Sequence, residues 1–332
     1  MKETSNIIGV VLLLLIMLFV ISIFQQNPPE EGECLSDNSK LFLLGSNLGA
    51  WNNDWYWKVN EPLVKNSKQR ELAKGVIGTF RFSCRDLSDE ALLELLEKVE
   101  ETGAEPFVVL PADNDQRAEK VVELFGDRVE YYEYGNEVGW WIGMSPEEHA
   151  ERMCEAIPKL KEINPGAKIG GNAQGDSDPV YMRRFLNHMR DTCPGVIPDF
   201  VSFHKYWAYT TESSQDILNR VETFDQEIEA LRDVTIEVYG ADLPIVISEW
   251  NWHAVPENYD DSRDLDEWFM GEFTSNVIDE MKEADVFMAH QYCYGSGCGD
   301  GHLDMISGSN PKSQYQVFSD QAERFCPDCK IC

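Results

Sequence analysis

The sequence predicts a (β/α)8 barrel, the fold in which eight parallel strands alternate with helices around a closed cylinder. Three observations lead to this class. Short apolar runs alternate with helical segments eight times between residues 40 and 325. The runs lack sustained polar alternation, as expected for parallel strands that are covered on both faces. No stretch rich in Gly, Ser or Pro divides the region, so we expect one barrel.

The chain begins with an apolar segment that predicts a transmembrane helix. Ile7–Phe24 is 18 residues long, contains no charge and is long enough to cross a bilayer core. Lys2 precedes it and an acidic stretch follows, which favours a cytoplasmic N-terminus. The segment ends without a small-residue cleavage site, so we expect residues 1–24 to be retained as a signal anchor. Residues 25–39 would then be a linker, and the barrel, residues 40–325, would face the outside of the cell.

The eight predicted strands are short, mostly apolar runs. They are Leu41–Gly45, Gly78–Ser83, Phe107–Leu110, Val129–Tyr134, Ala167–Gly171, Phe200–His204, Pro244–Ser248 and Val286–Gln291. The competing fold, a doubly wound sheet, needs a glycine-rich phosphate turn after its first strand. Gly45–Gly49 does not supply such a turn.

The helical segments between these runs have recognisable ends. Ser88 begins one of them, and its apolar face ends before Gly103. Ser145 begins another with a capping box that includes Glu148 and has proline at the first helical position. That helix should stop at residues 164–166, which read Asn-Pro-Gly.

The charge of the chain excludes several kinds of partner. Its formal net charge is −31, spread along the sequence without an acidic tail. Such a surface repels nucleic acid and anionic lipid headgroups, and a neutral carbohydrate suits it better than a polyanionic glycan. Solubility or adaptation to salt explains the charge equally well, so the charge limits the partners without identifying one.

Nine cysteines in an exported chain predict disulfide bonds, and the odd number leaves at least one without an intramolecular partner. Cys293 and Cys298 are close enough to close one loop. The tail, residues 326–332, carries three cysteines but no histidine follows, so we favour disulfides over a zinc site there. Cys34, at the other end of the barrel region, is a sterically reasonable partner for that tail. We predict no metal site and no cofactor.

Two strand ends carry a carboxylate beside tryptophans. The strand that ends at Tyr134 leads into Asn136 and Glu137, which precede two indoles, and the run Pro244–Ser248 leads into Glu249. The carboxyl ends of all strands meet at one face of a barrel. Hydrolysis of a glycosidic bond needs two carboxyl groups that face each other across the bond. The pair therefore predicts a glycosidase, although either glutamate alone is as well explained as a structural acid.

Other polar and aromatic residues follow the same strand ends. Arg81 ends strand two, where it is equally suited to pair with Glu133 in the barrel core, and His204 ends strand six, two residues before Tyr206. Eight of the nine tryptophans follow strands one, four, six and seven: Trp51, Trp55, Trp57, Trp140, Trp141, Trp207, Trp250 and Trp252. Indoles gathered on one rim offer flat apolar faces to sugar rings.

From Leu41 to Phe325 these motifs resemble clan A of the glycoside hydrolases, which implies an Asn-Glu acid/base at strand four and a nucleophilic glutamate at strand seven. The segment from Gly45 to Trp51 and the His204-x-Tyr206 pair are similar to family 5. The motifs Ile169–Gly171, Phe200–His204 and Val246–Asn251 are closer to family 39 and its relatives, families 51 and 79. Two residues depart from the clan: Val138 replaces a common proline, and Tyr292 replaces a common tryptophan at strand eight.

The chemistry of a retaining glycosidase assigns a role to each candidate. Glu137 must be protonated to act as acid/base, so we expect apolar surroundings from Trp140 and Trp141 to raise its pKa. Glu249 must stay ionised to act as nucleophile, which Arg81 and Tyr206 would favour. Asn136 is placed to bind the sugar 2-hydroxyl. The full set expected to bind substrate is Asn47, Trp51, Arg81, Asn136, Trp141, His204, Tyr206, Trp250 and Tyr292.

Three other functions remain open on the sequence. A carbohydrate-binding surface protein without turnover would keep the tryptophans, but would usually show a damaged glutamate pair. A metal-dependent hydrolase would need clustered histidine and carboxylate ligands, and the six histidines offer no such set beyond His204 and His290. A transglycosylase would use the same residues as the hydrolase.

Overall fold

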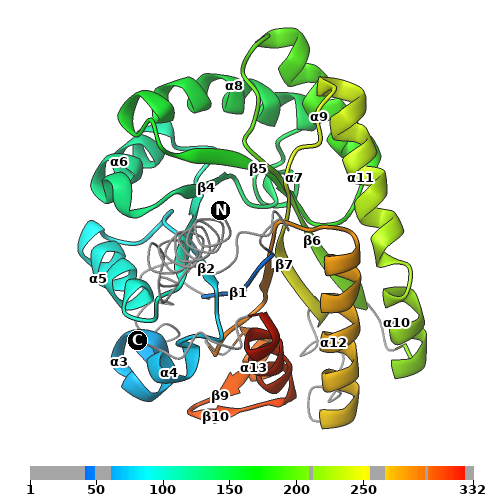
Figure 1. Cartoon of the computed structure of the whole chain (residues 1–332). Helices are drawn as coiled ribbons and strands as arrows, with labels where there is room; N and C mark the ends of the chain where they lie inside the picture. Colours follow the sequence, from blue (N-terminus) through cyan, green and yellow to red (C-terminus); the bar gives the residue numbers. More distant parts are fainter. Residues whose placement is uncertain (1–41, 49–60, 209–211, 255–265, 296–297, 326–332) are drawn as a thin grey trace, which may run out of the picture. The chain divides into compact units, whose positions relative to one another are not determined.

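Eight parallel strands close into the predicted barrel, with β1 hydrogen-bonded to both β2 and β8 (Figure 1). The strands are β1 (Leu43–Asn47), β2 (Thr79–Ser83), β3 (Glu105–Leu110), β4 (Tyr131–Tyr134), β5 (Lys168–Gln174), β6 (Val201–Ala208), β7 (Ile245–His253) and β8 (Met288–Gln291). The computed structural model describes residues 42–48, 61–208, 212–254, 266–295 and 298–325, which belong to one compact unit. The barrel confirms the predicted fold class.

Several predictions lie outside the described residues. They concern the helix and linker of residues 1–39, the tail of residues 326–332, Cys34, and the tryptophans Trp51, Trp55 and Trp57. Within the described residues, none of the helices is both long and apolar enough to cross a bilayer.

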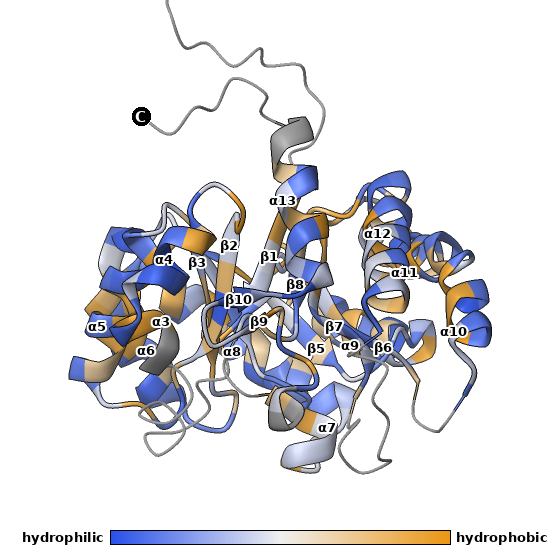
Figure 2. Cartoon of the chain, turned by 90° about the horizontal axis from the view of Figure 1, so that it is seen from below, coloured by the Kyte–Doolittle hydropathy of each residue, from blue (hydrophilic) through white to orange (hydrophobic). Residues whose placement is uncertain are grey.

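Helices surround the barrel in the view along its axis (Figure 1). They are α3 (Glu61–Lys65), α4 (Ser67–Ala73), α5 (Asp89–Glu100), α6 (Asp115–Phe125), α7 (Val138–Trp141), α8 (Pro146–Ile163), α9 (Pro179–Thr192), α10 (Ser214–Val221), α11 (Phe224–Tyr239), α12 (Glu267–Glu283) and α13 (Ser313–Phe325). A short hairpin of β9 (Ile306–Ser307) and β10 (Asn310–Pro311) precedes α13. The short helix α7 lies at one end of the barrel in Figure 2, directly after β4.

Local sequence signals explain the helix ends. Ser145 and Glu148 form the predicted capping box at the start of α8, and Asn164 caps its end. Ser88 caps α5 by accepting a hydrogen bond from the backbone N–H of Ala91. The predicted apolar face of α5 is buried except at Leu93, which is half-buried.

The barrel interior changes from apolar to polar toward the carboxyl ends of the strands. Phe107, Phe200, Val246 and Met288 form a separate apolar cluster. Two residues further along β8, the buried His290 hydrogen-bonds Thr79 (3.2 Å) and packs on the ring of Phe107. The two layers are two residues apart because side chains of a strand point inward at every second position. The next inward side chain therefore lies one layer closer to the carboxyl end.

Four of the predicted strands, β1, β5, β6 and β7, extend beyond their expected carboxyl ends, and β6 and β7 extend the furthest. β6 and β7 run to Ala208 and His253, beyond the predicted ends at His204 and Ser248. The added residues are rich in aromatic side chains, which favour strands. Tyr206 and Glu249 therefore lie within strands rather than just after them.

The described residues contain two disulfides. Cys293–Cys298 confirms the predicted loop closure, and Cys154–Cys193 was not predicted. The second bond joins α8 to the residue that caps α9, across a sequence separation of 39. Cys84 is a free, buried cysteine.

We expect the double replacement Cys154→Ser/Cys193→Ser to lower the free energy of unfolding by about 2–4 kcal/mol. The reason is that the bond restrains a long loop of the unfolded chain. Scanning calorimetry should show a melting temperature lower by on the order of 5–10 °C. The change lies on the outer helices, so the activity that the sequence predicts serves as the internal control. An unaltered melting temperature would contradict this expectation.

Candidate active site

The centre of the candidate site is the guanidinium of Arg81, a fully buried side chain on β2. Its Nε and Nη2 lie 2.8 and 2.6 Å from Oε2 of Glu133, and its Nη1 lies 2.7 Å from Oε1 of Glu249. Nη1 also donates to Asn47 Oδ1 (2.9 Å) and Nη2 to Asn136 Oδ1 (2.5 Å). Burial alone would lower the pKa of Arg81, but the two carboxylates raise it, so the group stays charged. Arg81 thus combines the two roles that the sequence left open.

Asn47 lies beneath this guanidinium rather than in the opening of the barrel. Its side chain is buried, with only 1% of the residue exposed. The amide Nδ2 donates to the backbone carbonyls of Ser248 (3.0 Å) and His290 (3.2 Å), and Oδ1 accepts from Arg81. Asn47 therefore positions Arg81, which corrects the prediction that it contacts the sugar directly.

Glu249 projects into the site from β7 and is 6% exposed. Arg81 donates to its Oε1, and the hydroxyl of Tyr206 donates to its Oε2 at 2.8 Å. Burial and the nearby charge of Glu249 raise the pKa of Tyr206 well above its usual value, so Tyr206 keeps its proton and remains a donor. Both partners that the sequence predicted for Glu249 are in place.

Glu137 follows β4 and begins α7 with an unusual backbone conformation. Its φ of 43° and ψ of 44° lie in the left-handed region, which costs a non-glycine residue about 1–2 kcal/mol. Its backbone N–H donates to the carbonyl of Ala173 (2.8 Å), at the irregular end of β5. Side-chain Oε2 accepts from Nε1 of Trp141 (2.9 Å), and Oε1 lies 2.9 Å from Nδ1 of His204. Glu137 is thus held by contacts of its backbone to β5 and of its carboxylate to α7 and β6.

The electrostatic environment of Glu137 differs from the prediction. Burial raises the pKa of Glu137, but the hydrogen bond and charge of His204, together with the N–H of Trp141, lower it by more. Trp140 and Trp141 are 86% and 72% exposed, so they do not form the expected apolar enclosure. The predicted rise in the pKa of Glu137 is therefore wrong, because a basic partner outweighs desolvation.

His204 lies between the two glutamates. The side chain is fully buried on β6, and its Nδ1 lies 2.9 Å from Oε1 of Glu137 and 3.6 Å from Oε2 of Glu249. Burial lowers the pKa of His204, but the two carboxylates raise it above the ordinary value. The two opposite pKa directions favour an ionised Glu137 beside a protonated His204. His290 differs, because burial and the charge of Arg81 lower its pKa far below the ordinary value.

The tryptophans divide into two groups. Trp250, Trp252 and Trp207 are buried between the barrel and its helices. Trp250 stacks on Phe318 of α13, with ring centroids 6.1 Å apart. The prediction that Trp250 binds substrate is therefore wrong. Side chains alternate along a strand, so an inward Glu249 directs Trp250 and Trp252 outward.

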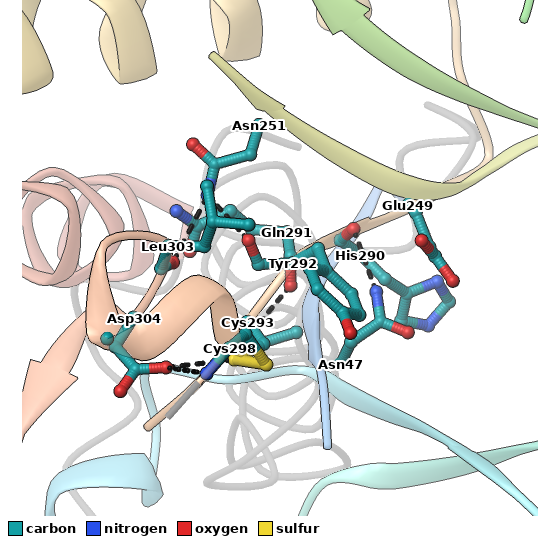
Figure 3. The surroundings of a disulfide bond; sticks show 12 residues. Asn47, Glu249, Asn251, His290, Gln291, Tyr292, Cys293, Cys298, Leu303 and Asp304 are labelled. Carbon is teal, nitrogen blue, oxygen red and sulfur yellow. Dashed lines mark hydrogen bonds between the residues drawn. A yellow bond between two sulfur atoms is a disulfide. The ribbon is translucent and has the colours of Figure 1, made fainter. Parts of the chain in front are cut away.

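Trp141 and Tyr292 lie where the sequence predicted them. Trp141 is exposed beside Glu137. Tyr292 follows β8 and is half-buried, close enough to Tyr206 to contribute to the raised pKa of that residue. Figure 3 shows Tyr292 in the same view as Asn47, His290 and Glu249. The sequence analysis did not assign Asn251, the buried residue that binds the backbone of Tyr292.

Among the described residues, Cys293, Cys298 and Asp304 form the one group with the residue types and spacing for a metal ion. The disulfide occupies both sulfur atoms of this group. The thiolates that would bind a metal are therefore not available in the oxidised protein.

Comparison with known proteins agrees with this geometry. Residues 130–283 match glycosyl hydrolases family 39, a region that includes Glu137, His204 and Glu249. The matched region is less than half of the 332 residues. No curated protein matches the sequence.

Solved structures with the same barrel include three glycosidases. A glucosidase from Croceicoccus marinus is 14% identical, with a TM-score of 0.59 over 77% of this chain and 62% of its own. AbfB, a family 51 α-L-arabinofuranosidase from Bifidobacterium longum, is also 14% identical, with a TM-score of 0.59 over 77% and 66%. A monomeric β-xylosidase from Caulobacter crescentus CB15 is 14% identical, with a TM-score of 0.62 over 84% and 66%.

The chain therefore spans 62–66% of the length of these three structures. The TM-scores show that these structures share the fold of this chain, and identities this low show the fold alone. Together with the family 39 match, they confirm the predicted resemblance to clan A. The matched family consists of glycosyl hydrolases, the class of enzyme that this resemblance implies.

Proposed function

We propose that this chain is a retaining glycoside hydrolase that cleaves β-glycosidic bonds of a neutral oligo- or polysaccharide by double displacement. Glu249 is the nucleophile and Glu137 the acid/base. The family 39 match supports the class of reaction. The geometry of the two glutamates supports the stereochemical course.

The observation that carries the proposal is the distance of both carboxylates from one nitrogen. Oε1 of Glu137 and Oε2 of Glu249 lie 2.9 and 3.6 Å from Nδ1 of His204. By the triangle inequality these two oxygens are at most about 6.5 Å apart, at or below the shortest separation of inverting enzymes, ~6.5–9.5 Å. A pair this close leaves little room for a water between sugar and carboxylate. It supports direct attack by Glu249.

The contacts of Glu249 suit a nucleophile. Arg81 and Tyr206 each donate to one of its oxygens, which fixes the orientation of the carboxylate. Glu249 attacks the anomeric carbon while the glycosidic oxygen leaves, and water later releases the sugar from the ester. Asn136, held by Arg81, is placed to bind the 2-hydroxyl of the sugar.

Glu137 must supply a proton in the first step and accept one in the second. We place that proton in the free protein on Nδ1 of His204, which lies 2.9 Å from Oε1. When a sugar covers the site and excludes water, the separated charges of this pair are disfavoured and the proton moves to Glu137. His204 is therefore a positioning and proton-holding residue for the acid/base.

The pH dependence follows from this pair. The active form carries one proton on Glu137 and His204 together. In the wild type that proton is lost with the pKa of His204, which the carboxylates raise, so we expect kcat/KM to fall only above pH ~6.5, the ordinary pKa of histidine. In His204→Gln only the carboxyl of Glu137 carries the proton, so the alkaline limb should move to lower pH by about 1–2 units.

The measurement is a pH profile of kcat/KM for both proteins. His188→Gln is the matched control, because His188 lies on α9 and pairs with the exposed Glu151. Its profile should equal that of the wild type. An alkaline limb that stays in place in His204→Gln would contradict the assignment.

Turnover and its stereochemistry test the proposed function directly. The purified chain is incubated with aryl β-xylosides, aryl β-glucosides, aryl α-L-arabinofuranosides and neutral xylo- and gluco-oligosaccharides, and the anomeric proton of the first product is followed by NMR. We expect cleavage of at least one β-glycoside with retained configuration. An inverted product overturns the mechanism. If none of these compounds is cleaved but at least one binds, the proposed enzyme activity is overturned in favour of a carbohydrate-binding surface protein.

We also propose that residues 7–24 anchor the protein in a membrane, with the barrel on the extracytoplasmic side. The uncharged apolar stretch of the sequence supports this proposal. Fractionation of cells that express the full chain tests it. The protein should sediment with membranes and its barrel should be digested by external protease. Recovery in the soluble fraction would contradict it.

A further inference from the structure

The described residues that follow β8, Tyr292–Gly295 and Cys298–Met305, form a cross-braced segment that we call the β8 loop. The Cys293–Cys298 disulfide is buried within it (Figure 3). The backbone N–H of Cys293 donates to Leu303 (3.0 Å), and Met305 donates back to the carbonyl of Cys293 (3.0 Å). Asp304 accepts from the backbone N–H of Cys298 (3.1 Å). These contacts fix Cys293, the residue next to Tyr292.

Asn251 fixes Tyr292 from the opposite side. This buried residue of β7 lies two positions after Glu249 and donates through Nδ2 to the carbonyls of Tyr292 (2.5 Å) and Leu303 (3.1 Å). Its Oδ1 accepts from the backbone N–H of Trp252 (2.7 Å), so the amide orientation is determined. One strand therefore holds both the proposed nucleophile and the anchor of the loop.

The β8 loop also contacts Asn47, the residue that positions Arg81. The backbone N–H of Tyr294 donates to the carbonyl of Asn47 (3.0 Å), whose side chain holds the guanidinium. Tyr292 itself donates from its backbone to Trp250 (2.9 Å). The segment around Tyr292 is thus bound to β1, to β7 and to its own disulfide.

Stability alone does not account for this arrangement. The Cys293–Cys298 bond has a sequence separation of 5, against 39 for Cys154–Cys193. A short closed loop restrains the unfolded chain less than a long one. The buried bond and the buried amide instead converge on one backbone position at the site.

We infer that Asn251 and the Cys293–Cys298 disulfide are positioning elements that hold Tyr292 against the sugar ring at the bond to be cleaved. The inference rests on the proposed function. Tyr292 contacts the sugar, whereas the disulfide and Asn251 act through Tyr292. A small displacement of a group that orients the substrate lowers the rate strongly.

The first measurement compares kcat/KM of two double cysteine variants and of Asn251→Leu with that of the wild type on the same substrate. We expect Cys293→Ser/Cys298→Ser and Asn251→Leu each to lower kcat/KM by about 10–100-fold. Cys154→Ser/Cys193→Ser is the matched control, because that disulfide joins the outer helix α8 to the end of α9. Because it closes a longer loop, its removal should lower the melting temperature more than the loop variant does, yet keep kcat/KM within about twofold.

The second measurement separates positioning from general loosening of the fold. The loop cysteine variant and Asn251→Leu are each combined with Tyr292→Ala. If the disulfide and Asn251 act through Tyr292, their variants should not lower kcat/KM below that of Tyr292→Ala alone. If they damage the structure independently, the fold-losses of the single variants should multiply.

If the wild type is active and the loop variants are as active as the wild type, the inference is overturned. Effects that multiply in the Tyr292→Ala background also overturn it. An inactive wild type instead overturns the proposed function, so the two failures are distinct.

Discussion

Glu249→Ala should lose turnover by on the order of 10⁵-fold, because the variant lacks the carboxylate that we propose attacks the anomeric carbon. Azide should restore activity toward an aryl glycoside by occupying the space that the carboxylate leaves. It then attacks from the face of Glu249, and the product is a glycosyl azide of inverted configuration. NMR of that azide identifies the face from which attack occurred.

Glu137→Ala should behave differently under the same conditions. Loss of the acid should cost about 10²–10⁴-fold for a sugar leaving group and less for an activated phenol that departs without a proton. Azide then attacks the glycosyl-enzyme on Glu249 from the opposite face, and the product keeps the configuration of the substrate. Glu155→Ala, an exposed position on α8, is the control and should keep wild-type activity. Azides of the same configuration from both variants would contradict the assigned roles.

Arg81→Met should be the most damaging change to stability within the barrel mouth. It leaves the buried carboxylates of Glu133 and Glu249 without their cation, which costs about 3–5 kcal/mol of the free energy of unfolding. Denaturant titration measures the loss. Arg85→Met is the matched control, because that arginine pairs with Asp113 at the surface and should change stability by less than about 1 kcal/mol.

A second variant separates the stability of the site from its chemistry. Arg81→Met/Glu133→Gln removes one of the two uncompensated charges, so part of the lost stability should return. Activity should not return, because Glu249 still lacks its donor. Equal stability losses for Arg81→Met and Arg85→Met would show that the buried network does not contribute as described.

The apolar runs predicted the barrel because covered parallel strands need apolar side chains on both faces. The same signal misplaced the ends of β6 and β7, since it stops at the first polar residue while the strands continue through Tyr206 and Trp252. The position of Trp250 was predictable from strand alternation relative to Glu249. Clustering along the sequence was not a sufficient guide, because adjacent residues of a strand point to opposite sides.

The charge state of Glu137 depends on a contact that the sequence does not reveal. His204 is 67 positions away, and only the register of β4, β5 and β6 brings its Nδ1 within reach of the carboxylate. The Cys154–Cys193 bond has the same origin, since it requires α8 and α9 to pack in one alignment. The sequence supplies the residue types, whereas the packing determines which of them meet.

The left-handed backbone at Glu137 has a consequence for protein engineering. Glycine or asparagine adopts that conformation more readily than glutamate does. Selection for heat resistance alone would therefore favour replacement of the proposed acid/base. A screen that ranks variants by melting temperature alone would enrich inactive variants. Any effort to stabilise this barrel therefore needs turnover as a second criterion.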